Sequence, residues 1–390
     1  MSRFTLHHGD SREVLKTLAE ASVDSIVTDP PYGIRFMGQA WDGADIEAEA
    51  AKRRAAESHC PQATQRGAHK SIAAEAGKYD RALAANHAFQ AWTEEWAREA
   101  LRVLKPGGYL LCFAGTRTYH RMVSGVEDAG FEIRDQIGWA FGSGFPKSHN
   151  GEWGGTALKP AWEPIVLARK PLIGTVEENW REHGTGSLNI DGCRVETDAP
   201  RDWREARRNK ESDEARNVYG KGLAGSMKVD ATTLGRWPAN LIHDGSDEVV
   251  SLFPREAGAA AGSAARFFYC AKASREDRNE GCEHMAKKPL LWSSGTQNPG
   301  SFQAEGTDRS SQNFHPTVKP TDLMRWLIRL MTPAGGLVLD PFMGSGSTGK
   351  AAMMEGMRFV GIDLTAEYVA IARARIDFAL RQGHQPGLGL

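Results

Sequence analysis

The sequence has no long hydrophobic run, no surplus of charge and few cysteines. None of its apolar stretches approaches the roughly 18 consecutive residues that a membrane-spanning helix needs. Its 48 Lys and Arg residues face 49 Asp and Glu residues, so it lacks the basic excess common in nucleic-acid-binding domains. The five cysteines are scattered and odd in number, which argues against a disulfide framework and for a reducing, cytoplasmic setting. The first residues contain no apolar signal segment, so neither secretion nor a membrane partner is expected.

Short runs rich in Val, Ile, Leu and Phe predict an α/β fold. Buried strands are predicted at 4–7, 25–28, 109–114, 131–141, 164–168, 337–340 and 358–362. Helical patterns are predicted at 11–19, 92–104, 348–356 and 367–379. The alternation of strands and helices is typical of a mainly parallel sheet, although the two strands within 131–168 could be antiparallel because no clear helix separates them.

The α/β pattern occupies the two ends of the chain, and the middle differs. Residues 38–90 are Ala-rich and polar, which favours a helical or mobile insertion. Residues 171–314 carry many charges and glycines with little periodicity. With 390 residues, two domains are expected, one of them a sheet built from both ends around a large insertion.

A glycine-rich turn follows the apolar strand predicted near the C-terminus. Gly344 and Gly346 allow the backbone to approach a ligand closely, directly after the acidic residue Asp340. Asp363 ends the next strand about 20 positions later, where a carboxylate can accept hydrogen bonds from ribose hydroxyls. A nucleoside ligand is therefore predicted, and a tight turn that binds nothing is the alternative.

The same turn partly matches the phosphate-binding loop of nucleotide hydrolases. Residues 344–350 fit the first part of that motif, but Ala351 stands where a hydroxyl would bind Mg²⁺. The carboxylate of Asp340 would also repel a triphosphate. A ligand without a polyphosphate fits these residues better.

A second cluster of functional residues follows the strand predicted at 25–28. Asp29 is followed by Pro30 and Pro31, which fix the backbone and remove two N–H donors, and then by Tyr32. A carboxylate, a rigid carbonyl and a flat ring thus lie close together, which suits a planar group that bears an amino group. Taken alone, the segment could also be a turn that ends the strand with Asp29 as a cap.

Together, segments 29–33 and 340–348 resemble the two signatures of the β-class amino-directed DNA methyltransferases. Segments 8–10, 104–111 and 313–320 resemble further parts of that family, and segments 144–147 and 235–242 resemble those of its phage-type and solitary bacterial members. The resemblance implies a circularly permuted, Rossmann-like fold that depends on S-adenosyl-L-methionine. The implied strands of a seven-stranded, mostly parallel sheet are, in fold order, 337–340, 358–363, 4–10, 25–29, 108–114, 131–141 and 163–169.

The resemblance also implies how the chain is divided into functional parts. Residues 1–170 would form the catalytic part, 171–314 an inserted target-recognition domain, and 315–390 the cofactor-binding part. The implied partner is double-stranded DNA, and a homodimer and a cognate restriction nuclease both stay open. A basic strip within 201–228 could contact phosphates or be a solvated surface.

The implied reaction is methyl transfer to N6 of an adenine flipped out of the duplex. Tyr32 would stack on the flipped base, while Asp29 and the carbonyl of Pro30, held rigid with Pro31, would accept the hydrogens of its amino group. Transfer of the same kind to N4 of cytosine is the alternative, and Asp29 favours adenine because family members with Ser at this position tend to be cytosine-directed. A P-loop ATPase and a non-catalytic DNA-binding protein are more remote alternatives.

The resemblance assigns the cofactor to residues from both ends of the chain. Gly344 and Gly346 would approach its methionyl part, Asp340 its ammonium group or a bridging water, and Phe342 its sulfonium. The remaining implied contacts are Asp363 to the ribose, Asp10 to the adenine, and Thr317 and Lys319 to the carboxylate, although Lys319 could equally be solvated. No metal site is expected, because Cys270, Cys282 and His284 lack the spacing of a four-ligand zinc site.

Overall fold

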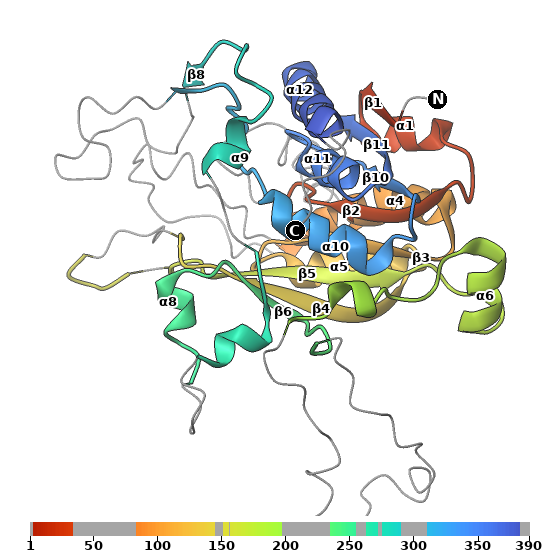
Figure 1. The fold of residues 1–390 in the computed structure, drawn as a ribbon, viewed down its shortest axis with the longest axis horizontal. Coiled ribbons are helices and arrows are strands. Elements are labelled where there is room, and N and C mark those ends of the chain that lie inside the picture. The colour runs from red at the N-terminus through yellow and green to blue at the C-terminus, as the bar shows by residue number, and fades with distance from the viewer. Residues whose placement is uncertain are drawn as a thin grey trace, which may run out of the picture.

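The computed structural model describes residues 3–33, 83–144, 151–155, 157–196, 235–254, 263–271, 275–289 and 310–382. These residues form a mixed sheet covered on both faces by helices (Figure 1). Nine strands lie in the order β1-β11-β10-β2-β3-β5-β4-β6-β7. Their bounds are β1 Phe4–His8, β2 Val23–Thr28, β3 Leu104–Phe113, β4 Glu132–Ala140, β5 Trp162–Arg169, β6 Leu241–His243, β7 Tyr269–Cys270, β10 Leu337–Asp340 and β11 Arg358–Asp363.

The centre of the sheet joins segments from opposite ends of the chain. Strand β10 pairs in parallel with β2, so that Val338 lies opposite Ser25. Strand β1 pairs in parallel with β11. Strand β5 alone runs antiparallel to its neighbours β3 and β4, which confirms the antiparallel pair within 131–168. The predicted Rossmann-like sheet, built from both ends around a long middle, is therefore confirmed.

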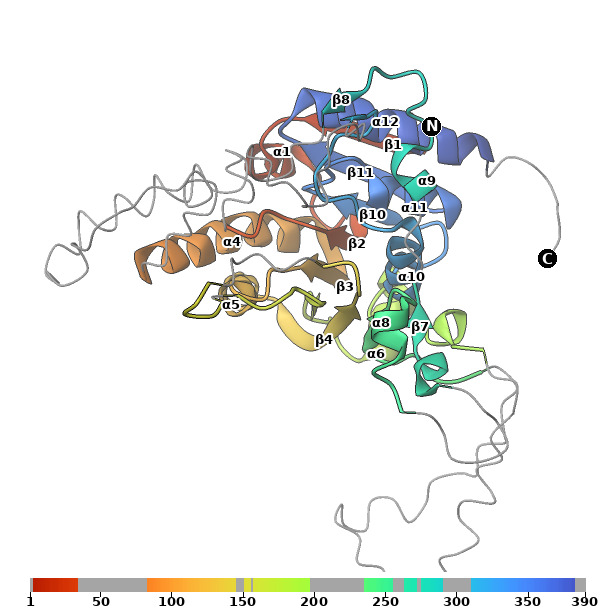
Figure 2. The ribbon, with the colours of Figure 1, turned by 90° about the vertical axis from the view of Figure 1, so that its left-hand side faces the viewer.

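Helices form a layer on each face of this sheet (Figure 2). One layer contains α1 Ser11–Thr17, α4 Leu83–Val103 and α5 Tyr119–Asp128, and the other contains α10 Thr321–Met331, α11 Ser347–Met354 and α12 Ala366–Gln382. Buried side chains fill both interfaces. Parallel strands need such cover on both faces, which explains why all six residues of β2 are buried.

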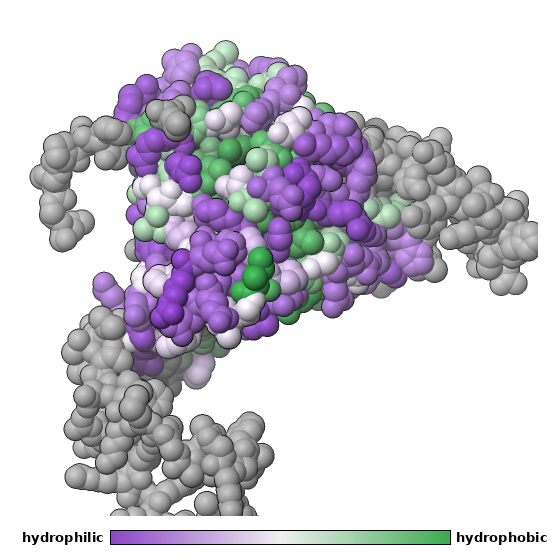
Figure 3. Space-filling view, turned by 90° about the vertical axis from the view of Figure 1, so that its right-hand side faces the viewer, coloured by the Kyte–Doolittle hydropathy of each residue, from purple (hydrophilic) through white to green (hydrophobic). Residues whose placement is uncertain are grey.

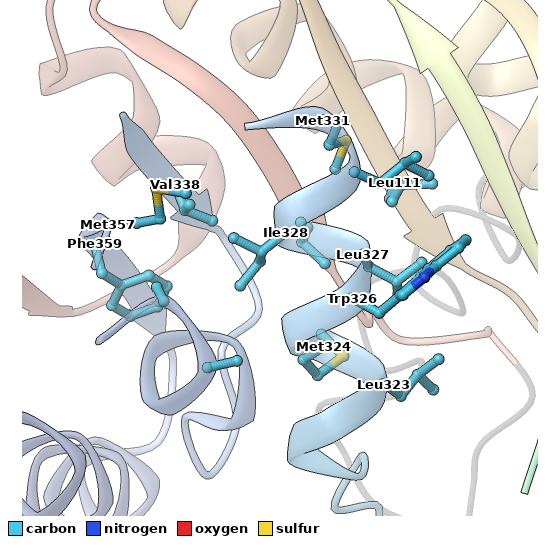
Figure 4. Packing of buried hydrophobic residues seen from close by; sticks show 14 of the residues in the cluster. Leu111, Leu323, Met324, Trp326, Leu327, Ile328, Met331, Val338, Met357 and Phe359 are labelled. Atoms are coloured by element: carbon cyan, nitrogen blue, oxygen red, sulfur yellow. The ribbon is translucent and has the colours of Figure 1, made fainter. Parts of the chain in front are cut away.

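Helix α10 holds the segment that precedes the glycine-rich turn. Trp326 and Leu327 lie on the side of Leu111 of β3, while Ile328 points toward Val338 and Phe359 (Figure 4). Burial of each large apolar side chain stabilises the fold by about 1.5–3 kcal/mol. The helix therefore fixes residues 313–320, which lead directly into it.

The sheet has nine strands where the resemblance implied seven. Strands β6 and β7 come from the region 171–314 and continue the sheet beyond β4, with Trp139 opposite Ile242 and Ile242 opposite Tyr269. They contain three and two residues, too few to produce a recognisable alternation of polar and apolar positions. Part of the proposed recognition domain thus shares the main sheet, and its role in DNA recognition stays a prediction.

The rest of the middle region consists of short elements. They are α6 Val176–His183, α8 Asp247–Val250, α9 Arg275–Asn279, the 3₁₀ turns η3 Asp191–Cys193 and η5 Ala264–Phe267, and the two-stranded sheet of β8 Lys288–Pro289 with β9 Ser310–Ser311. Most of the predicted insertion 38–90 and all of the strip 201–228 lie outside the described residues; from 38–90 the structure describes only the start of α4.

Hydrophilic side chains cover most of the face shown in Figure 3, with small hydrophobic areas between them. Within the ranges that the structure describes, no helix is both long and apolar enough to cross a membrane.

Candidate active site

Functional motifs from the two ends of the chain meet at one edge of the sheet. Asp29 follows β2, and Asp340 is the last residue of its neighbour β10. The hydroxyl of Thr28 donates a hydrogen bond to Oδ1 of Asp340 at 2.7 Å. Ligands of open α/β sheets bind outside the carboxyl ends of the strands. The structure therefore places both motifs where one bound molecule could contact them together.

Four ionisable side chains form a compact cluster at this edge, here called the Asp29 cluster: Asp29, Tyr32, Glu163 and Lys319. The hydroxyl of Tyr32 lies 2.7 Å from Asp29 Oδ1 and 2.6 Å from Glu163 Oε1. The ammonium of Lys319 lies 3.0 Å from Asp29 Oδ2, 3.0 Å from Glu163 Oε1 and 3.3 Å from the Tyr32 hydroxyl. Lys319 is only 8% exposed, so it is not a solvated surface lysine.

Burial governs the charges of the Asp29 cluster. It raises the pKa of Asp29, against the opposing effect of the Lys319 ammonium. It also raises the pKa of Tyr32 well above the usual value, and the nearby carboxylates add to that effect. For Lys319, burial lowers the pKa, but Asp29 and Glu163 together outweigh it and raise the net value. Lys319 therefore stays charged, Tyr32 stays neutral, and Asp29 holds a proton more readily than an exposed aspartate.

The backbone after Asp29 is fixed by contacts with the surrounding elements. Pro30 is buried, and the carbonyl of Tyr32 accepts a hydrogen bond from the Thr118 hydroxyl at 2.9 Å. Gly33 has a φ of +67°, and a Cβ there would lie 2.6 Å from the ring of Phe89. The conformation that presents the Asp29 carboxylate is therefore preorganised in the folded chain.

Asp340 lies beneath the glycine-rich turn, with both carboxylate oxygens occupied. Oδ1 accepts from Thr28 and from the backbone N–H of Phe342 at 3.1 Å, and Oδ2 accepts from the Thr348 hydroxyl at 2.5 Å. Burial nevertheless raises the pKa of Asp340 to about 7. Its side chain therefore orders the turn from within the protein.

The two glycines of the turn have different surroundings. At Gly344, a Cβ would lie 2.7 Å from Nε2 of His315, in the segment before α10. At Gly346, which caps α11 with a φ of +78°, a Cβ would lie 2.8 Å from the Cα of Ala372 in α12. Close internal packing therefore requires a glycine at position 346 in the protein itself.

Two more predicted cofactor residues lie at the ends of adjacent strands. Asp363 ends β11 and accepts backbone N–H groups from Gly344 at 2.9 Å and Thr365 at 2.7 Å. Burial raises the pKa of Asp363 to about 6. Asp10 follows β1 and caps α1, where a hydrogen bond from the Arg12 side chain lowers the pKa of Asp10. Carboxylates thus follow or end three neighbouring strands, because β10, β11 and β1 are adjacent.

The remaining predicted residues lie at the margins of this group. The ring of Phe342 packs on helix α4, with ring centroids 5.6 Å from Trp92 and 5.3 Å from Trp96. The backbone N–H of Thr317 donates to Nδ1 of His315 at 3.3 Å. Burial lowers the pKa of His315 to about 3, so this imidazole is neutral at physiological pH.

Sequence patterns did not reveal the ionic contacts that support the glycine-rich turn. The ammonium of Lys350 lies 2.5 Å from Asp277 Oδ1 and 2.6 Å from Glu280 Oε2. This pairing in the protein interior argues against the P-loop interpretation, in which the lysine would bind phosphate. The fully buried Arg375 donates to the Ser345 carbonyl at 2.9 Å and also contacts Asp277.

Glu163 was also absent from the predicted site. It lies near the start of β5, where a single acidic residue before an apolar run gives no signal beyond a strand boundary. Concerning metals, the described part of the chain contains no group of three His, Cys, Asp or Glu side chains arranged to hold an ion.

Comparison with known proteins agrees with these motifs. Residues 23–374 match the family model of N6/N4 methyltransferases, described as DNA methylase. The Type II methyltransferase M.HindIII of Haemophilus influenzae is 27% identical over 205 residues, which cover 47% of this chain and 64% of that protein. The DNA adenine methyltransferase YhdJ of Escherichia coli is 42% identical over 65 residues, which cover 17% of this chain and 22% of that protein.

Among solved structures, the cytosine-N4-specific PvuII DNA methyltransferase is 16% identical, with a TM-score of 0.49 and coverage of 98% of this chain and 93% of that one. The chain spans less than two thirds of the length of the curated relatives named above. The family match, however, extends over most of the chain and includes both motifs. This protein therefore belongs to the N6/N4 DNA methylase family.

Proposed function

We propose that this protein transfers a methyl group from S-adenosyl-L-methionine to N6 of an adenine in double-stranded DNA. One observation carries the proposal: Asp29–Pro30–Pro31–Tyr32 and the glycine-rich turn lie on adjacent strands at the same edge of the sheet. A donor bound at the turn and a base bound at Asp29 would thus be neighbours. Membership of the N6/N4 DNA methylase family supports the same chemistry.

The residues of the turn fit this cofactor. Its ribose hydroxyls and ammonium group are hydrogen-bond donors, and Asp363, Asp340 and Asp10 supply carboxylates at the ends of three adjacent strands. The positive φ angles of Gly344 and Gly346 form a tight turn, and the missing Cβ atoms let His315 and Ala372 pack closely against it. Thr317 completes the proposed site on the side of the carboxylate, whereas the ammonium of Lys319 is held by Asp29 and Glu163. When bound, the cofactor supplies an electrophilic methyl group carried on sulfur.

The Asp29 segment acts on the target base. The adenine must leave the helical stack before its amino group can reach these residues. Asp29 and the Pro30 carbonyl then accept the two amino hydrogens, and the ring of Tyr32 stacks on the base. This geometry withdraws the nitrogen lone pair from the ring and directs it at the methyl group. Positioning and fixed acceptors supply most of the catalysis, since no covalent enzyme intermediate is formed.

The products balance without an additional reactant. The lone pair of the target nitrogen would form the new bond to the methyl carbon, the electrons of the broken carbon–sulfur bond would leave with the thioether product, and the nitrogen would lose one proton. The ionised carboxylate of Asp29 is placed to receive that proton, because it already accepts a hydrogen bond from the same N–H group.

Methyl transfer to N4 of cytosine is the second candidate, since that exocyclic amino group offers the same two hydrogens. The family match covers both reactions. Asp29 favours adenine, because family members with Ser in place of this residue tend to be cytosine-directed. The methylated base therefore has to be identified directly.

The proposal is tested by transfer of a labelled methyl group to duplex DNA, followed by digestion to nucleosides. We expect label in N6-methyladenine from the wild-type protein and less than about 1% of that activity from Asp29→Ala, with cofactor affinity retained. Asp135→Ala, which removes an exposed carboxylate of β4, is the matched control and should remain active. Label in N4-methylcytosine would support the second candidate. An active Asp29→Ala variant would refute the mechanism.

A further inference from the structure

In this structure, each carboxylate oxygen of Asp29 already has a partner. Oδ1 accepts the Tyr32 hydroxyl at 2.7 Å, and Oδ2 lies 3.0 Å from the Lys319 ammonium. In the proposed reaction, the same carboxylate accepts a hydrogen of the target amino group. A carboxylate oxygen can accept a second hydrogen bond, but the amino hydrogen would then compete with Tyr32 and Lys319 for the lone pairs of Asp29. Because both are largely buried, losing their acceptor would be costly unless another one is within reach.

Glu163 supplies that second acceptor for both groups. Its Oε1 lies 2.6 Å from the Tyr32 hydroxyl and 3.0 Å from the Lys319 ammonium. The Glu163 side chain is 15% exposed, and its residue is held in the sheet opposite Trp139. A carboxylate held on a strand of the sheet thus contacts the same two groups as Asp29.

The number of protons in the cluster also indicates that Asp29 and Glu163 share their hydrogen-bond partners. A phenol carries one hydrogen, so Tyr32 cannot donate to Asp29 and Glu163 at once. Both short contacts are hydrogen bonds only if one carboxyl group is itself protonated. The ionisable groups that face Asp29 are Tyr32, Cys112, Glu163, Lys319 and Asp340. Among them Lys319 alone carries a positive charge, so one shared proton would leave Asp29, Glu163 and Lys319 neutral overall.

We propose that Glu163 is a positioning residue for methyl transfer, which takes over the Tyr32 hydroxyl and the Lys319 ammonium when the target base binds to Asp29. The inference rests on the proposed function. Glu163 does not touch the base or the donor, and it adds no chemical step. Its effect is to leave Asp29 ionised and available to accept the amino hydrogen, while the buried Tyr32 and Lys319 keep a hydrogen-bond acceptor.

The test is Glu163→Gln, which retains the shape of the side chain and removes its charge. We expect kcat to fall about tenfold or more, because Lys319 then stays on Asp29, while cofactor affinity measured by calorimetry changes less than about twofold. The acid limb of the pH–rate profile should move to lower pH, since the charge of Glu163 contributes to the raised pKa of Asp29. A shift of this limb separates positioning from a structural role, which would lower activity at every pH alike.

Glu132→Gln is the matched control, because Glu132 lies in the adjacent strand β4 and pairs with Arg169 at 2.6 Å, outside the Asp29 cluster. It should retain the wild-type kcat and acid limb. Glu163→Asp gives an independent result: its charge keeps the acid limb in place, but its shorter reach lowers kcat. A kcat of either Glu163 variant within about twofold of the wild type, or an unmoved limb in Glu163→Gln, overturns the inference. If the wild type and Glu132→Gln both fail to methylate DNA, the proposed function itself has failed.

Discussion

Replacing Gly346 with alanine tests what shapes the glycine-rich turn. Its φ of +78° is left-handed, a conformation that costs an L-residue about 1–2 kcal/mol. The new Cβ would also lie 2.8 Å from the backbone of Ala372 in α12, and such overpacking costs a further 1–3 kcal/mol or so. We therefore expect the free energy of unfolding of the ligand-free protein to fall by about 2–5 kcal/mol.

Gly356→Ala is the matched control for this change. Gly356 lies just beyond the other end of α11 with a φ of +75°, and a Cβ at this position would meet nothing within 4 Å. Only the backbone cost of about 1–2 kcal/mol applies there. Urea unfolding followed by circular dichroism, without cofactor, gives both values. Equal losses for the two variants would refute the packing argument, as would a Gly346→Ala variant that loses cofactor affinity but no stability.

Three further predictions concern the buried charges. The pKa of Asp340 in the folded protein is about 7, above the ordinary value of 3.8. The folded state therefore binds this proton more tightly than the unfolded state, which adds stability below a pH of about 4. That added stability is lost as the pH rises to about 7. The free energy of unfolding of the wild type relative to Asp340→Asn should therefore decrease over this window in urea titrations, and an increase would contradict it. Because Asp277 and Glu280 hold Lys350, ATP with Mg²⁺ should leave the melting temperature unchanged; a rise that Lys350→Met abolishes would restore the P-loop interpretation. Arg375→Met should lower the free energy of unfolding by about 3–5 kcal/mol in the same urea titrations. A decrease of less than about 1 kcal/mol would show that the buried contacts of Arg375 contribute little to stability.

The strands of the central sheet could be predicted because each is a buried run bounded by turn residues. Strand β2 is buried along its whole length, and β10 is apolar up to Asp340. Strands β6 and β7 could not be predicted, because they are very short and form by pairing with β4 and with β6, respectively, without a recognisable pattern of their own. Helix α4 begins at Leu83, before the predicted start at 92, and Ala88 and Phe89 in the added turns are buried against the sheet layer.

The residues of the candidate site also differ in how far the sequence could predict them. Asp29, Tyr32 and Asp340 could be found from sequence, because each is part of a motif at the end of a buried strand. Glu163 could not, since Tyr32 and Lys319 are 131 and 156 positions away from it and only the antiparallel strand β5 brings it to them. Lys319 was predicted for the cofactor carboxylate, and the structure adds its ion pair with Asp29.

Mapping of methylated bases in DNA from cells that express this chain tests the proposed function most directly. We expect N6-methyladenine at one recurrent sequence, and none at that sequence in cells that express Asp29→Ala at the same level. Methylation at N4 of cytosine would contradict the choice of base. DNA without either modification, or equal modification by Asp29→Ala, would contradict the proposal that the two motifs at this sheet edge carry out methyl transfer.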